Sequence, residues 1–106
     1  MEEARYEGLA ADAFRRVLDL FEEVDPVDAD VEAGGDVIRI DYRGGAHMVI
    51  NTQRPTRQIW LAGGQSAWHF SYDETSGEWR DDKGRGDELF ATVRRLTHAA
   101  IGQDLP

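Results

Sequence analysis

Cysteine is absent from this chain of 106 residues. Its absence excludes disulfide bridges, a thiol nucleophile, thiolate zinc sites and any metal cluster held by cysteines of this chain alone. The chain also lacks an apolar run near the ~20 residues that a membrane span needs. It contains no internal repeat or low-complexity tract, so we expect one soluble domain over residues 1–106 and no contact with a membrane.

Basic residues are scarce in the first third of the chain. Residues 1–36 hold twelve acids and three bases, and residues 37–106 hold nine of each, so the entire net charge of −9 lies in the first third. This asymmetry disfavours nucleic acid, whose phosphates need a basic surface, and favours cations or a basic protein. The first residues, MEEARYEG, are acidic rather than basic like a secretory or mitochondrial leader, and we expect a cytoplasmic protein.

A long amphipathic helix is predicted at the start of the chain. Apolar residues recur at three- and four-residue steps over residues 6–24, which is typical of a helix of about five turns. Pro26 argues against continuation past Asp25. The side opposite the apolar stripe carries four acids: Asp12, Asp19, Glu22 and Glu23.

The middle of the chain has the two-residue alternation of strands. In residues 27–33 the alternation places Val27, Ala29, Val31 and Ala33 on one face and Asp28, Asp30 and Glu32 on the other. The segments VIRIDY, HMVINT, QIWLA and AWHFSY follow as further strands, with a short sixth at residues 78–80. Close Gly-rich turns between them favour a meander of antiparallel hairpins.

A second amphipathic helix closes the chain. Apolar spacing predicts it from Leu89 to Ala100, with Asp87 as the N-cap and Gly102 near its end. Both helices need cover for an apolar stripe, and one sheet face can supply it. We therefore predict an α+β two-layer sandwich, with two helices packed on one face of a five- to six-stranded antiparallel sheet.

One segment of the chain carries a family resemblance. The stretch MVINTQRPTRQIWLAG, followed by WHF and EWRDDKG, resembles the frataxin family, in particular its bacterial CyaY branch. The resemblance covers essentially the whole chain and implies the same order of helix, strands and helix. It also implies weak iron binding through an acidic ridge, and binding to the cysteine desulfurase and the scaffold protein of iron–sulfur cluster assembly. We expect a monomer, with oligomerisation in the presence of iron as the alternative.

The acidic ridge consists of carboxylates from the predicted first helix and first strand. Hard cations such as iron prefer oxygen ligands, and acids three or four apart on a helix can converge. No histidine or cysteine joins them, so we expect weak and unselective binding, and an EF-hand is rejected because Ala33 and Arg39 occupy its Gly and Glu positions. Leu18 interrupts the ridge where relatives carry further acids. The alternative is a solvated face without a ligand. The candidate ligands are Asp19, Glu22, Glu23, Asp25, Asp28, Asp30 and Glu32.

Trp60 is the second candidate feature. If Ile59 and Leu61 point to the helices, Trp60 lies on the open sheet face, where tryptophan is a frequent interface anchor. The alternative is a surface tryptophan covered locally by Arg54 or Arg57. The resemblance assigns partner binding to Glu22, Glu23, Asn51, Gln53, Gln58 and Trp60.

The remaining rings are assigned structural roles. We expect Trp68 and Trp79 to pack sheet edges or loops, His47 and His69 to be structural rather than metal ligands, and His98 to have no partner. No catalytic motif is present, so we expect no enzyme, and ferroxidase activity is disfavoured because exposed carboxylates control oxygen chemistry poorly. Three functions remain open: a regulatory adaptor of the desulfurase, an iron chaperone, and a generic acidic interaction module.

Overall fold

The computed structural model describes all of residues 1–106. Along the chain, one helix precedes six strands and a second helix follows them. The helices are α1 (Glu3–Leu20) and α2 (Leu89–Ile101), and the strands are β1 (Ala29–Gly34), β2 (Val37–Tyr42), β3 (His47–Gln53), β4 (Gln58–Gly63), β5 (Ser66–Asp73) and β6 (Glu78–Asp81). A single 3₁₀ turn, η1 (Arg54–Thr56), joins β3 to β4.

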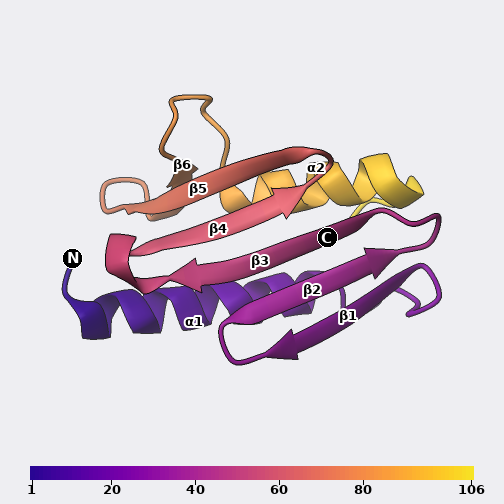
Figure 1. The fold of residues 1–106 in the computed structure, drawn as a ribbon, viewed down its shortest axis with the longest axis horizontal. Coiled ribbons are helices and arrows are strands. Elements are labelled where there is room, and N and C mark those ends of the chain that lie inside the picture. The colour runs from indigo at the N-terminus through magenta and orange to yellow at the C-terminus, as the bar shows by residue number, and fades with distance from the viewer.

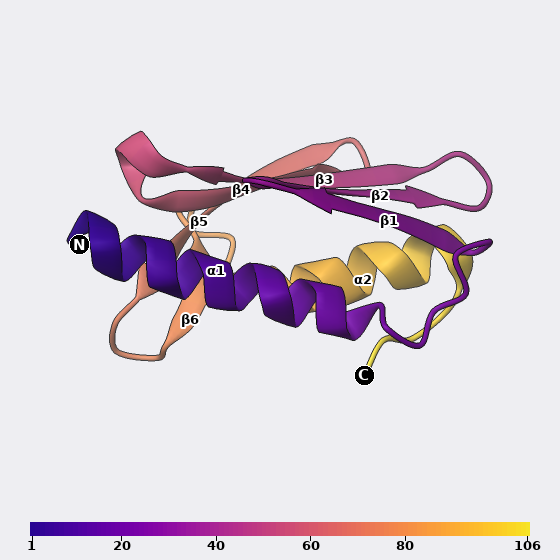
Figure 2. The same cartoon turned by 90° about the horizontal axis from the view of Figure 1, so that it is seen from below.

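The six strands form one antiparallel sheet in the order β1-β2-β3-β4-β5-β6 (Figure 1). Both helices lie on the same side of this sheet, and the opposite face is open (Figure 2). The predicted α+β two-layer sandwich is therefore confirmed. Neither helix combines the length and the apolar character that crossing a bilayer requires. The core lies between the layers and includes the inward residues Ile38, Ile40, Met48, Ile50, Ile59, Leu61, Trp68 and Phe70 of the sheet.

The first helix is shorter than its apolar stripe predicts. It ends at Leu20, and residues 21–24 continue in tight turns in which Phe21, Glu22 and Val24 donate to carbonyls three residues earlier. Phe21 and Val24 are nevertheless buried. The apolar periodicity therefore marked the buried face correctly while overestimating the length of regular helix.

The first strand begins two residues later than predicted. The Asp25 carboxylate accepts a hydrogen bond from the Val27 amide at 2.9 Å, and the Asp25 carbonyl accepts from the amides of Asp28 and Ala29. This turn takes Val27 and Asp28 out of the strand, and Val27 is 77% exposed rather than on the buried face. Ala33 shares the face of Ala29 and Val31, as predicted, since it pairs with the buried Ile38, although it is exposed near the end of this edge strand. Asp30 and Glu32 face outward as predicted.

The second helix begins with a different cap from the one predicted. The Glu88 carboxylate accepts hydrogen bonds from the amides of Phe90 and Ala91 at 2.9 and 3.0 Å, which satisfies two donors of the first turn. Asp87 instead accepts from Trp68 Nε1 at 2.8 Å. At the other end, Gly102 adopts the left-handed conformation (φ 70°) that ends the helix, as predicted.

Candidate functional site

The acidic ridge is present as a set of exposed carboxylates on two adjacent parts of the chain. Asp19, Glu22 and Glu23 lie at the end of α1 and in the turns after it, and Asp30 and Glu32 project from β1. No side-chain hydrogen bond or ion pair engages any of these five residues. Their charges are therefore available to a ligand or a partner.

Two predicted members of the ridge, Asp25 and Asp28, make contacts within the protein. Asp25 caps the turn before β1 through the Val27 amide. Asp28 forms an ion pair with Arg43, and the Arg43 amide also donates to the Asp28 carbonyl at 2.8 Å. Asp28 therefore fastens the start of β1 to the end of β2, and it lies just before the strand that carries Asp30 and Glu32 rather than within it as predicted. Local spacing alone gives no sign of this contact with Arg43.

The ridge does not converge on a metal centre. No three histidine, aspartate or glutamate side chains lie close enough together to hold a metal ion. The predicted approach of Asp19 and Glu23 rested on a shared helix face, and that face is absent because the helix ends at Leu20 and Glu23 lies in a turn. Cations at this surface would have a few carboxylate ligands each, completed by water.

The sheet face supplies the second group of candidate residues. Ile59 and Leu61 are 0% and 2% exposed beneath the helices, so Trp60 lies on the open face, as predicted. The register aligns Asn51, Trp60 and His69 in one row across β3, β4 and β5. The alternative read from the sequence, a surface tryptophan covered locally, is met in part, although the covering side chain is neither Arg54 nor Arg57. Instead the indole stacks on the imidazole of His69, with centroids 4.1 Å apart and an interplanar angle of 13°.

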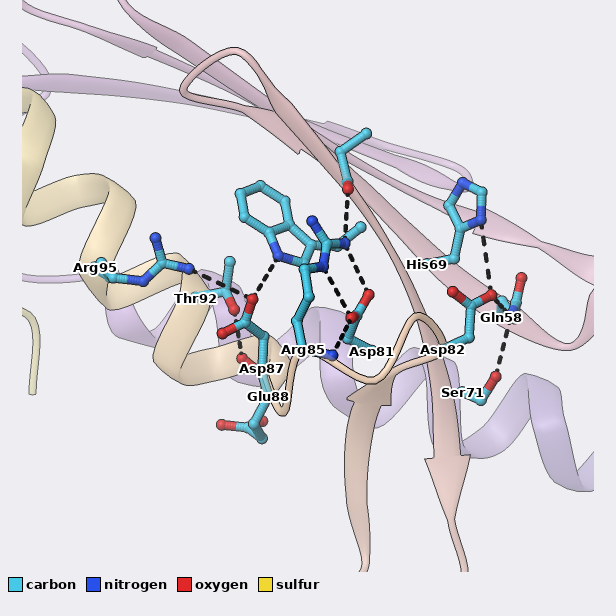
Figure 3. Close-up of polar contacts among 12 residues, drawn as sticks. Gln58, His69, Ser71, Asp81, Asp82, Arg85, Asp87, Glu88, Thr92 and Arg95 are labelled. Atoms are coloured by element: carbon cyan, nitrogen blue, oxygen red, sulfur yellow. Dashed lines mark hydrogen bonds and ion pairs between the residues drawn. The ribbon is translucent and has the colours of Figure 1, made fainter.

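Gln58 lies beside Trp60 on this face, two residues away along β4. Its side chain is nearly buried, with the residue 8% exposed, and both ends of its amide are hydrogen-bonded. The Oε1 atom accepts from Trp60 Nε1 at 2.9 Å. The Nε2 atom donates to Ser71 Oγ at 3.0 Å and to Asp82 Oδ2 at 2.9 Å (Figure 3). Gln58 therefore orients Trp60, whereas a partner would reach the half-buried side chains of Asn51 and Gln53 more readily.

The turn between β3 and β4 is tied to the first helix by a buried tyrosine. Tyr6 Oη donates to the Gln58 carbonyl at 2.6 Å and accepts from the Gln53 amide at 3.1 Å. Tyr6 is 1% exposed, and burial raises the pKa of its hydroxyl. Sequence reasoning placed Tyr6 in the apolar stripe and missed its polar role, for which local periodicity carries no signal.

A polar clamp holds the loop between β6 and α2 around Trp68. The Arg85 guanidinium donates to both carboxylate oxygens of Asp81, at 2.8 and 2.9 Å, and to the Ala67 carbonyl (Figure 3). These hydrogen bonds hold the pKa of Asp81 below its ordinary value. Arg85 also lies over the Trp68 ring, 5.3 Å from its centroid, while Asp87 accepts from the indole. This clamp has a structural role that the sequence did not reveal.

The other rings are placed as follows. Trp68 and Trp79 are 4% and 3% exposed, as structural roles require. His98 was expected to have no partner, and this is wrong because its Nδ1 atom lies 2.8 Å from Asp104 Oδ1. His47 is exposed at the start of β3, and His69 lies 3.8 Å from the Asp82 carboxylate.

The fold and these two surfaces define a class of protein: a small α+β domain that presents an acidic ridge and an open sheet face with polar and aromatic side chains. Residues 1–103 match the family described as the frataxin-like domain. The iron-sulfur cluster assembly proteins CyaY of Azotobacter vinelandii and Pseudomonas aeruginosa are each 36% identical to this chain. Both alignments cover 99% of this chain, and they cover 94% and 95% of the two relatives.

Solved structures give the same result for the fold. Frataxin from Psychromonas ingrahamii superimposes with a TM-score of 0.87 at 24% identity, over 99% of this chain and 96% of that one. Trimeric frataxin from the yeast Saccharomyces cerevisiae, complexed with ferrous iron, gives 0.75 at 30% identity, over 90% and 87%. The chain belongs to the frataxin-like family.

Proposed function

We propose that this protein is a non-enzymatic regulatory adaptor of iron–sulfur cluster assembly. It binds the cysteine desulfurase machinery and modulates cluster formation, and it binds iron weakly through the acidic ridge. The observation that carries this proposal is the set of five unengaged carboxylates at the end of α1 and along β1, in a chain whose net charge lies entirely in its first third. The names of the bacterial relatives support the pathway.

The partner contact is the stronger of the two ridge functions. Without a third convergent ligand, a bound cation stays largely hydrated and is poorly selected. A basic patch on a protein needs no such convergence, because complementary charge spread over a surface raises the association rate and fixes orientation. We place the desulfurase contact on Glu22 and Glu23. Asn51, Gln53 and Trp60 extend the partner surface onto the open sheet face, with Gln58 beside Trp60.

The test is charge reversal at the ridge with a matched control. Glu22→Lys with Glu23→Lys should abolish desulfurase binding and the effect on cluster assembly. The control, Glu2→Lys with Glu3→Lys, makes the same change in net charge at the other end of α1, roughly 27 Å away along an 18-residue helix. It should retain binding. Unchanged binding of the ridge variant at moderate salt would contradict the proposal.

An iron chaperone that delivers ferrous iron is the second candidate, favoured by the yeast frataxin complexed with ferrous iron. In that case Asp19→Ala with Glu23→Ala should reduce iron delivery, while charge reversal elsewhere on the ridge should matter little. A generic acidic module is the third. It predicts no saturable change in the amide chemical shifts of residues 12–32 when ferrous iron is added to isotope-labelled protein.

The proposal also covers location and assembly. We place the protein in the cytoplasm as a monomer that binds no nucleic acid, with iron-dependent oligomerisation as the alternative. Sedimentation with and without ferrous iron separates these states.

A further inference from the structure

Trp60 is held on two sides. Its ring stacks on His69 at a centroid distance of 4.1 Å, and its Nε1 donor is fixed by Gln58 Oε1 at 2.9 Å. A stacked ring restricts tilt of the indole, while the hydrogen bond restricts rotation in its plane. Besides the exposed His47, Trp60 and His69 are the rings that the strands place on the open face, since the other strand aromatics lie on the helix side.

One carboxylate connects both contacts. Asp82 Oδ2 accepts from Gln58 Nε2 at 2.9 Å and lies 3.8 Å from His69 Nδ1 (Figure 3). In the backbone, the Asp82 amide donates to the His69 carbonyl at 2.9 Å. Asp82 therefore orients the amide that holds the indole edge and stands beside the imidazole that covers the indole face. The Arg85–Asp81 clamp fixes the loop that carries Asp82.

We propose that His69 and Asp82 are positioning residues that hold Trp60 in one orientation on the open sheet face, ready for the partner. This inference rests on the proposed function, in which Trp60 contacts the assembly machinery. An aromatic anchor fixed before binding loses less side-chain entropy when the complex forms. His69 and Asp82 thereby act on recognition through Trp60.

The free protein provides the first test. Each tryptophan gives one indole N–H resonance in a nitrogen–proton correlation spectrum, and the Trp60 resonance is assigned by its loss in Trp60→Phe. His69→Ala should shift and broaden this resonance and leave those of Trp68 and Trp79 in place, which also shows that the fold is intact. His69→Phe keeps a stacking ring and should restore a sharp Trp60 signal. His47→Ala, an exposed histidine on the same face, should change nothing.

Binding to the desulfurase and scaffold provides the second test. His69→Ala and Asp82→Ala should weaken binding by roughly two- to tenfold, in line with the typical strength of a stacked aromatic pair, and His69→Phe should recover most of the loss. An unperturbed Trp60 resonance in His69→Ala overturns the positioning role. Unchanged affinity in His69→Ala, alongside weakened binding of Trp60→Ala, overturns its link to recognition. If Trp60→Ala itself binds normally, the proposed partner surface fails, and the indole resonances still decide the positioning role.

Discussion

Replacing Tyr6 by phenylalanine removes one oxygen atom from the joint between the first helix and the sheet. In the native protein this oxygen donates to the Gln58 carbonyl at 2.6 Å and accepts from the Gln53 amide at 3.1 Å. The aromatic ring, 1% exposed and packed edge-on against Trp79 at 6.2 Å, is retained in the variant. The substitution therefore tests the two hydrogen bonds and leaves apolar burial nearly unchanged.

The expected loss follows from the partners that are left behind. Removing one member of a hydrogen bond costs about 1–3 kcal/mol when the remaining group stays buried and unsatisfied. The Gln58 carbonyl lies in a buried residue, whereas Gln53 is half-buried and water can replace part of its bond. We therefore expect Tyr6→Phe to lower the free energy of unfolding by about 2–3 kcal/mol and the melting temperature by roughly 10–15 °C.

Thermal and urea unfolding followed by circular dichroism measure this loss. Tyr72→Phe is the matched control, because Tyr72 is half-buried beside Trp79 and its hydroxyl makes no hydrogen bond. The control should change stability by less than about 0.5 kcal/mol. Equal stabilities of the two variants would refute the reasoning. Burial also raises the pKa of Tyr6, so its contribution to stability is present below its ordinary value of 10.0 and lost as the pH rises above it. Wild type should therefore lose stability more steeply than Tyr6→Phe in alkali.

Two further predictions concern charge. The pKa of Asp81 is lowered by hydrogen bonds from Arg85, so its contribution to stability is present above its ordinary value of 3.8 and is lost as the pH falls through the lower folded value. Asp81→Asn should therefore be less stable by about 1–3 kcal/mol at neutral pH and flatter in acid, and parallel acid curves for the two proteins would contradict this. At low ionic strength the ridge carboxylates repel one another, so added salt or calcium should raise the melting temperature. An unmoved melting temperature would count against this repulsion, and a rise specific to ferrous iron would indicate a site rather than screening.

The regular elements could be predicted because their apolar periodicity is long and unambiguous. Errors occurred where a side chain had two local choices. Asp87 and Glu88 are both acids before α2, and only the distant Trp68 indole decides that Asp87 is used elsewhere and Glu88 forms the cap. The turn around Asp25 likewise delays the start of the predicted first strand. Which side chain forms a cap or a turn depends on contacts with residues distant in the sequence, and hydrophobic periodicity carries no information about those contacts.

In the candidate site, likewise, the features that follow from strand alternation and pairing could be predicted, and the feature that depends on a loop conformation could not. The outward direction of Trp60 follows from alternation, and its pairing with His69 was also within reach of the sequence. The two-residue turn after Gly63 pairs that residue with Ser66 and therefore aligns Trp60 with His69 across the hairpin. The position of Asp82 beside His69 was out of reach, because it depends on the conformation of the loop after β6.

The two proposed recognition surfaces belong to one rigid frame. The Tyr6 hydroxyl bonds the start of α1 directly to the residues that flank η1, and the end of α1 leads into the ridge and β1. A partner that contacts both the ridge and Trp60 would therefore meet charges and an aromatic anchor whose separation is fixed before binding. Weak metal occupancy at the ridge would then change charge without changing this geometry. Iron would thus alter the strength and rate of the contact and leave its orientation to Trp60 and the residues that hold it.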